Sequence, residues 1–269
     1  MLRCAGVFRE PSHSPGRIDD DRAILERTGD VLAAETGCKV VFFTPEDMLH
    51  DVFTEFAPDV IFYMCEEPRY LDVISAYEQR GCITVNPVKG VFNTFRDNLV
   101  DLFEDKEFFP SSIMIDVDEY AGDADFDGCM WVKRGDYHAV EPEDVRCARD
   151  RHELHDILAR FRERGISRVM LQRHVSGDLV KFYGVSTRWF HWFYHKGQEV
   201  SYYRFSVESL RNTCSDAASS AGLEVYGGDA IITEDGFVYV IDLNAWPSFA
   251  LVRDVAAGHI ARHIVERMS

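Results

Sequence analysis

The stretch VYVIDLNAWPSF, from Val238 to Phe249, is the part of this chain that decides the predicted fold. Four apolar residues lead directly into Asp242 and Asn244, which stand two positions apart, and a loop with a proline follows. A carboxylate at the end of an apolar strand is costly to bury without a partner. The stretch therefore predicts that solvent, a base or a metal lies opposite Asp242, and the rest of the sequence has to decide between these.

The segment before this stretch contains Asp235-Gly236, and Asp-Gly is the strongest short hairpin signal. If these residues form a two-residue turn, counting outward places Asp229 directly opposite Asp242, and opposite residues share a sheet face. Asn244 lies two residues along and shares that face. Opposed like charges destabilise a sheet unless a cation lies between them, and these oxygen ligands suit Mg²⁺ or Mn²⁺. A longer turn would instead leave two unrelated acids, and the hairpin alone does not decide between these arrangements.

Composition limits the classes of protein to which the chain can belong. Its 269 residues allow one large domain or two to three subdomains. The net charge of −17 argues against nucleic acid as a partner, because nucleic-acid-binding proteins carry basic stripes and this sequence has none. No apolar run approaches the length of a membrane span, so no membrane partner is expected. The seven cysteines are scattered without a CxxC pair, so we expect free thiols and a cytoplasmic location.

Two folding patterns divide the chain. Up to residue 87, apolar strands alternate with helices, which predicts a parallel sheet covered on both faces. Strands are predicted at 2–8, 39–44, 59–65 and 83–86, and helices at 19–37, 46–56 and 69–81. The later part predicts antiparallel sheets, with a helix at 91–108, strands at 111–117, 129–134, 168–175 and 178–186, an aromatic hairpin at 188–205, a helix at 206–222, the acidic hairpin at 227–244 and a last helix to 268.

Common cofactor motifs are missing from the sequence. Neither a GxxxxGK[ST] phosphate loop nor a GxGxxG fingerprint is present, so the common nucleotide folds are not supported. The pairs His259/His263 and His152/His155 have suggestive spacings, but neither has a third ligand at zinc-like spacing. Surface-helix histidines are the favoured interpretation of both pairs.

The acidic hairpin, GGDAI…VIDLNAWPSF, resembles the carboxy-terminal metal hairpin of the ATP-grasp superfamily. In that superfamily an acid on one strand and an acid-x-Asn on the next hold the magnesium ions of ATP. Three upstream segments resemble the family in the same order: ITVNPVKGVFNTFRDNL, which joins the N-terminal domain to the nucleotide half; MWVKR, whose lysine meets adenine and the α-phosphate; and the hinge strand VMLQRHVSGDLVKFYGV. Each motif alone is weak, and their joint order and spacing over nearly the whole chain carry the resemblance.

The resemblance implies an α/β then α+β architecture, the ATP-grasp fold behind an N-terminal parallel α/β (pre-ATP-grasp) domain. Its expected parts are residues 1–87, an N-terminal ATP-grasp lobe at 88–176 and a C-terminal lobe with the metal hairpin at 177–269. It also implies a set of site residues: Asp229, Asp242 and Asn244 for metal; Lys133, Lys181 and Arg96 for phosphate charge; His138 for a phosphate; backbone groups of Gln172, Arg173, His174 and Val175 for adenine; and Asp178 for the ribose. We assign Arg204 to the acceptor carboxylate or acyl phosphate, with a structural ion pair as the alternative, and Lys181 to phosphate or substrate.

Two departures from the family pattern concern the grip on phosphate. Many relatives have Asp-Lys where this chain has Asp97-Asn98, and Arg96 is the nearest basic substitute. Relatives also cover the phosphates with a glycine-rich loop, which here contains only Gly135.

The expected function is an ADP-forming ligase that uses ATP with Mg²⁺ or Mn²⁺ and joins a small carboxylate to an amine or thiol. The C–N bond is the favoured product. A small-molecule kinase and a non-catalytic nucleotide-binding relative are the alternatives. Residues 9–19 follow a strand of the predicted sheet and are expected to help choose the substrate. The substrate's identity and the oligomeric state, a homodimer included, stay open.

Overall fold

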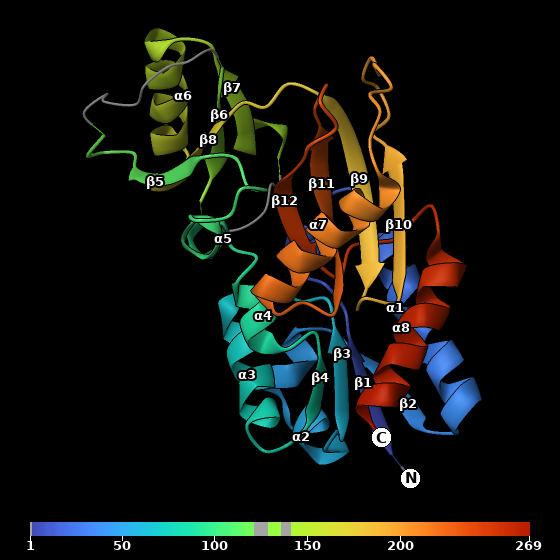
Figure 1. Cartoon of the computed structure of the whole chain (residues 1–269). Helices are drawn as coiled ribbons and strands as arrows, with labels where there is room; N and C mark the ends of the chain where they lie inside the picture. The colour runs from blue at the N-terminus through green and yellow to red at the C-terminus, as the bar shows by residue number, and fades with distance from the viewer. Residues whose placement is uncertain (1, 121–128, 136–140) are drawn as a thin grey trace.

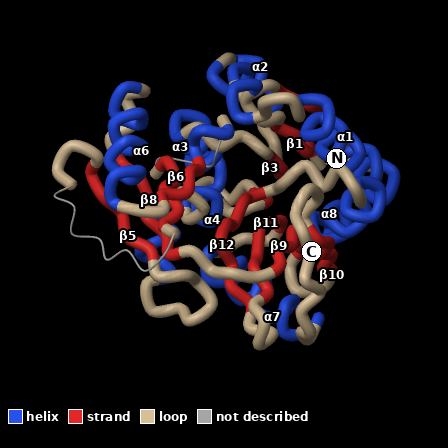
Figure 2. Tube along the Cα trace, turned by 90° about the horizontal axis from the view of Figure 1, so that it is seen from above, coloured by secondary structure: helices blue, strands red, loops and turns tan. Residues whose placement is uncertain are grey.

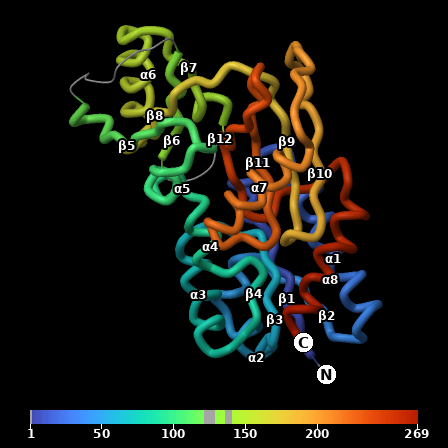
Figure 3. Tube along the Cα trace, in the orientation of Figure 1, coloured from blue at the N-terminus to red at the C-terminus, as the bar shows by residue number. Residues whose placement is uncertain are grey.

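The computed structural model describes residues 2–120, 129–135 and 141–269, which build three four-stranded sheets (Figures 1 and 3). One parallel sheet lies in the N-terminal part and two antiparallel sheets follow. The predicted change from an α/β to an α+β pattern is therefore confirmed. Each sheet falls within one of the three predicted segments, whose boundaries stay predictions.

The N-terminal sheet has the strand order β2-β1-β3-β4. Its strands are β1 (Arg3–Val7), β2 (Lys39–Phe43), β3 (Val60–Tyr63) and β4 (Ile83–Val85), and its helices are α1 (Ile18–Thr36), α2 (Asp51–Phe56) and α3 (Pro68–Glu78). Helix α1 has three acids in its first turn, and their negative charge is stabilised by the positive end of the helix dipole. The helix ends at Gly37, whose backbone is in the left-handed region. The helix predicted at 46–56 is divided into a 3₁₀ turn η2 (Glu46–Leu49) and α2, because His50 is extended between them.

The middle lobe, which we define as residues 112–173, forms the sheet β5-β8-β6-β7. Its elements are β5 (Ser112–Asp116), β6 (Met130–Arg134), a 3₁₀ turn η3 (Pro142–Asp144), β7 (Val145–Ala148), α6 (Arg151–Glu163) and β8 (Arg168–Arg173). Strand β7 was not predicted. The helix predicted at 91–108 is two helices, α4 (Val88–Phe92) and α5 (Arg96–Phe103), with an extended Phe95 between them.

The C-terminal sheet has the order β10-β9-β11-β12. Its elements are β9 (Asp178–Val185), β10 (Trp189–Tyr194), α7 (Val207–Ala221), β11 (Val225–Ile232), β12 (Val238–Ala245) and α8 (Arg253–Arg267). The hairpin predicted within 188–205 is wrong, because β10 pairs with β9 and residues 199–206 form no strand. Helix α8 returns to the N-terminal part and packs beside α1 (Figure 1).

The hairpin of β11 and β12 places Asp229 directly opposite Asp242, as predicted, but by a different route. The loop has one residue more than expected, because Ile232 pairs with Val238 and the Thr233 and Phe237 main chains close a three-residue tip. A β-bulge then adds Ile241 as an extra residue on β12. The two one-residue differences cancel, so the two aspartates still face each other.

Hydrophobic cores join the N-terminal and C-terminal parts on two sides. One cluster combines β3 and α1 residues with Trp246, Phe249 and the apolar face of α8, and another combines α3 residues with α7 and β12. The middle lobe has a core of its own, in which Val132, Phe161 and Val169 are buried, and Met170 of β8 belongs to the second shared cluster. The middle lobe is therefore attached to a body that the other two parts build together (Figure 2).

Cys129 and Cys147 lie beside each other at neighbouring strands β6 and β7, with their Cα atoms 6.3 Å apart, and are joined as a disulfide. The prediction of free thiols is therefore wrong for this pair, whereas the other five cysteines are free. In the described part of the chain, no helix has the length and apolarity needed to cross a membrane.

Candidate nucleotide and metal site

Two pockets meet at the paired aspartates. The first, the interlobe pocket, has a volume of about 320 Å³ and lies between the middle lobe and the hairpin β11–β12. The second, the domain-junction pocket, has a volume of about 300 Å³ and lies between the loop after β1 and the C-terminal sheet. Asp229 and Asp242 line both pockets. A ligand in one pocket and a ligand in the other would therefore both lie beside the same two carboxylates.

Cations already compensate the facing carboxylates. The Lys181 ammonium on β9 lies 2.8 Å from Asp229 Oδ1, and both side chains are more than half buried. The Arg96 guanidinium, which is 2% exposed, lies 4.0 Å from Asp242 Oδ1 and donates to the Arg134 carbonyl oxygen at 2.9 Å. The opposed charges that the sequence predicts are thus relieved by basic side chains on β9 and α5.

The donor set suits Mg²⁺ or Mn²⁺. Asp229, Asp242 and Asn244 supply hard oxygen ligands, and Asn244 lines the domain-junction pocket with both acids. In residues 2–120, 129–135 and 141–269, no cluster of three or more His, Cys, Asp or Glu could hold a metal by itself. A divalent ion here would therefore need further oxygen ligands, which water and substrate phosphates commonly supply to Mg²⁺ in nucleotide sites.

Lys133 on β6 joins the middle lobe to this hairpin. Its ammonium donates to Gln172 Oε1 at 2.8 Å and to the Ile241 carbonyl oxygen at 2.9 Å. Ile241 is the extra residue of the β-bulge, so the bulge presents a carbonyl that regular pairing would use within the sheet. Burial lowers the pKa of Lys133 to about 8, against the opposing effect of Asp242.

The hinge between β8 and β9 forms one wall of the interlobe pocket. The backbone N–H groups of Arg173 and His174 donate to the carbonyls of Ser111 and Cys129, and Gln172 uses its side chain on Lys133 and Ser112. Among the described residues, the peptide groups of Val175 make no backbone hydrogen bond.

Two predicted residues among those described are not brought to these pockets. Asp178 is 1% exposed and accepts the backbone N–H groups of Ser201 and Tyr203 at 2.7 and 3.0 Å, so its carboxylate anchors a loop and does not face the interlobe pocket. Arg204 is exposed, and its carbonyl packs over the hairpin tip at Gly236, outside both pockets. His138 lies outside the described residues.

The structure also adds residues that the motif comparison missed. The loop after β1, which was expected to help choose the substrate, lines the domain-junction pocket with Arg9, His13, Ser14 and Arg17. The only sequence signal for Arg9 is its place in Phe8-Arg9-Glu10, where charges directly follow an apolar strand. Asn98, which stands where many relatives have lysine, is exposed and donates to the Phe92 carbonyl. The basic residue of this segment that lines the interlobe pocket is therefore Arg96.

Comparison with known proteins gives a likeness in structure alone. No protein-family model and no curated protein matches the sequence. The ATP complex of D-alanine–D-alanine ligase from Bacillus anthracis has a TM-score of 0.72 at 14% identity, over 99% of this chain and 97% of that one. A RimK domain ATP-grasp protein from Sphaerobacter thermophilus has a TM-score of 0.72 at 15% identity, over 98% and 100%. The ATP-grasp ligase PsnB with a minimal precursor has a TM-score of 0.70 at 15% identity, over 100% of both chains.

The chain therefore has the ATP-grasp fold, with a parallel N-terminal domain, as the motifs predict.

Proposed function

We propose that this protein is an ATP- and magnesium-dependent ligase that activates a small carboxylate as an acyl phosphate and transfers the acyl group to an amine or thiol. The observation that carries the proposal is that the interlobe and domain-junction pockets share Asp229 and Asp242. ATP in the first pocket and the acceptor in the second would meet at these carboxylates. Structural neighbours described as ligases with ATP-grasp folds support the same class of reaction.

In the proposed reaction, a carboxylate oxygen of the acceptor attacks the γ-phosphorus of ATP, and the bond to the β-phosphate oxygen breaks to release ADP. The amine or thiol then attacks the acyl carbon, and inorganic phosphate leaves with loss of a proton from the attacking group. Phosphoryl transfer depends on positioning and charge neutralisation more than on side-chain nucleophiles. We assign neutralisation to Lys133, Arg96 and Lys181. Mg²⁺ bound by Asp229, Asp242 and Asn244 would supply further positive charge.

The interlobe pocket suits adenine because apolar side chains line much of it, including Trp131, Leu179 and Ile231. We assign the adenine edge to the peptide groups of Val175, which line the pocket and have no backbone partner in the described chain. A planar base there would lie beside Trp131, whose indole N–H is held by His174 at 3.1 Å.

We assign the acceptor to the domain-junction pocket. A volume of about 300 Å³ is at the lower end of the range for small-molecule sites, which favours a small acceptor. Arg17 is exposed at the pocket wall and has no ion pair within the described residues. Arg9, by contrast, is occupied by Glu66. Arg17 is therefore the guanidinium placed to receive an acid group of the acceptor, the role that the sequence assigned to Arg204.

The test combines binding with chemical trapping. The purified protein should melt at a higher temperature with millimolar Mg-ATP, because ligand binding stabilises the folded state by mass action. With ATP, hydroxylamine and a panel of small amino acids and hydroxy acids, the correct acid should give a hydroxamate together with ADP. A stable phosphorylated alcohol would establish the kinase alternative, and ATP binding without turnover over the whole panel would support the non-catalytic one. No thermal shift with Mg-ATP would contradict the nucleotide assignment itself.

A further inference from the structure

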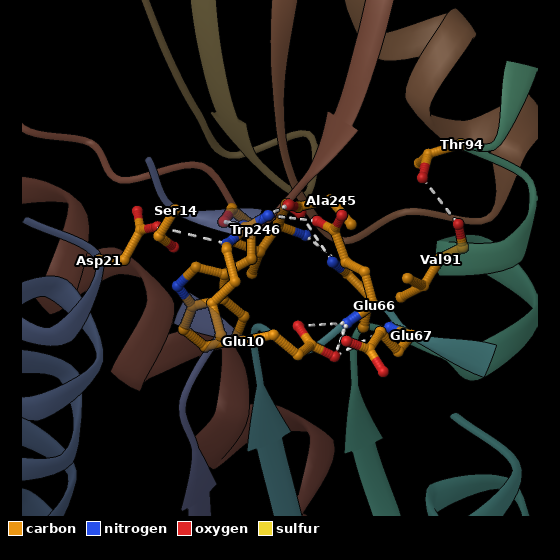
Figure 4. A network of polar contacts seen from close by, with 12 residues as sticks. Glu10, Ser14, Asp21, Glu66, Glu67, Val91, Thr94, Ala245 and Trp246 are labelled. Carbon is orange, nitrogen blue, oxygen red and sulfur yellow. Dashed lines mark hydrogen bonds and ion pairs between the residues drawn. The ribbon is translucent and has the colours of Figure 1, made fainter. Parts of the chain in front are cut away.

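Arg9 lies in the loop after β1 and joins three segments that are distant in sequence. Its guanidinium forms an ion pair with Glu66 from the loop after β3 and lies 3.4 Å from Asp21 Oδ2 of α1. It also donates to the carbonyl oxygen of Trp246 at 2.7 Å and approaches that of Ala245 at 3.4 Å. Figure 4 shows Asp21, Glu66, Ala245 and Trp246 around one network of polar contacts.

The partners of Arg9 are themselves fixed. Ser14 donates its hydroxyl to Asp21 at 2.5 Å. Glu10 accepts the backbone N–H groups of Glu66 and Glu67 at about 3 Å, which holds the loop after β3 in place (Figure 4). The Arg9 side chain is only 8% exposed. Burial opposes its charge, but Glu66 and Asp21 outweigh that effect and raise the pKa of Arg9. The guanidinium is therefore charged and oriented before any ligand binds.

The two carbonyls that Arg9 contacts directly follow Asn244. Trp246 has a φ of 38°, in the left-handed region that is uncommon for bulky residues. Such a conformation persists only where the surroundings hold it. Trp246 is fully buried, stacks on Phe62 with ring centroids 6.2 Å apart and donates its backbone N–H to the Val225 carbonyl oxygen. The N-terminal domain thus holds the end of β12, through Phe62 from one side and Arg9 from the other.

We propose that Arg9 is a positioning residue that fixes Asn244 at the candidate metal site by holding the backbone of the next two residues. The inference rests on the proposed function. Arg9 also lines the domain-junction pocket, so the same loop that meets the acceptor sets the end of the metal-binding strand. The planar fork of arginine is required, because one side chain must reach two carboxylates and two carbonyls at once, whereas lysine is a point charge.

The test measures metal binding without turnover. Mn²⁺ is titrated into the protein with a non-hydrolysable ATP analogue, and free Mn²⁺ is followed by electron paramagnetic resonance. Loss of a residue that orients metal ligands typically costs 10- to 100-fold in metal affinity. We expect Arg9→Lys and Arg9→Met to weaken Mn²⁺ binding by about 10-fold or more, while the affinity for the analogue in EDTA stays within about twofold of the parent.

Arg253→Met is the matched control. Arg253 forms an ion pair with Asp20 of α1 and so links the same parts of the chain, but no described contact joins it to residues 244–246. Arg253→Met should lower the melting temperature about as much as the Arg9 variants do, but it should leave the Mn²⁺ affinity unchanged. Parent-like Mn²⁺ affinity in both folded Arg9 variants would overturn the inference; if Arg9→Met does not fold, Arg9→Lys decides. If the parent itself binds Mn²⁺ no better than Asp242→Asn, the proposed metal site fails, which is a different result.

Discussion

Lys133→Met should remove two pH dependences of opposite sign, one in stability and one in nucleotide binding. Lys133 is 5% exposed, and burial lowers its pKa from an ordinary 10.5 to about 8. Between these values the unfolded chain binds more protons than the folded one, so the Lys133 contribution to stability rises with pH. At 1.36 kcal/mol per pKa unit, the free energy of unfolding should gain about 2–3 kcal/mol from this residue between pH 7 and pH 10.

Nucleotide binding should change in the opposite direction. The phosphates favour the charged ammonium, and the charged fraction of a group with a pKa of about 8 falls about tenfold from pH 7 to pH 9. Affinity for Mg-ATP should therefore fall by up to about tenfold over that range, with proton uptake on binding. Isothermal titration in buffers of different ionisation enthalpy measures both quantities.

The comparison with Lys133→Met isolates this residue. Burial raises the pKa of thiols such as Cys82, to about 12, and groups of that kind make stability fall at high pH in both proteins. The difference between the two urea-unfolding curves removes their effect. The variant should bind Mg-ATP weakly and without the pH dependence at Lys133. An Mg-ATP affinity of the parent that is independent of pH from 7 to 9.5, or one unchanged in Lys133→Met, would refute the assignment of Lys133 to phosphate.

Three further changes test the site. Asp229→Asn should lower the melting temperature of the ligand-free protein slightly, since it removes an ion pair worth about 1 kcal/mol, and should abolish most of the Mg-ATP-induced shift; an unchanged shift would contradict the metal assignment. Gly228→Ala would bring a Cβ to within 2.2 Å of a backbone oxygen of β12 and should lower the free energy of unfolding in urea by about 1–3 kcal/mol. Gly258→Ala is the control, because its added Cβ meets nothing within 4 Å and should not destabilise α8. Arg17→Met should raise the KM for the acceptor about tenfold or more without changing that for ATP, if its charge-assisted bond is worth about 1.5–3 kcal/mol; an equal or larger effect of Arg204→Met would restore the residue first predicted.

The predicted pairing of Asp229 with Asp242 in the acidic hairpin is correct, but only because a wrongly assigned turn and an unpredicted bulge cancel. In β12 the buried residues are Val238, Val240, Leu243 and Ala245, so the alternation changes phase between them. That change of phase indicates a bulge, but it is a pattern of burial that the sequence does not show, because residues 238–241 are all apolar. Counting from an ideal turn ignored it, and the pairing was correct because the longer loop compensated.

Contacts between distant residues explain what the sequence could not supply. The helix predicted at 91–108 has a continuous amphipathic pattern, yet it is interrupted where Asn93 donates its side-chain amide to the Ala221 carbonyl, 128 positions away. Asp178 follows the hinge at a position suited to a ribose ligand, but the loop at 201–203 takes its carboxylate. Arg17 and Arg204 look alike in sequence, and only the tertiary structure places Arg17 at the pocket wall.

The separate core of the middle lobe has a consequence for how the chain opens. Because the N-terminal and C-terminal parts share two cores, they should exchange their slowest amide protons together, whereas the amides of β6 and β8 report a smaller cooperative unit. The described polar link from β6 to β12 at Lys133 is one hydrogen bond, to the Ile241 carbonyl oxygen, which gives little resistance to such opening. A molecule bound between the middle lobe and the hairpin β11–β12 would hold the two together. Its binding would be seen first as slower deuterium uptake in the middle lobe.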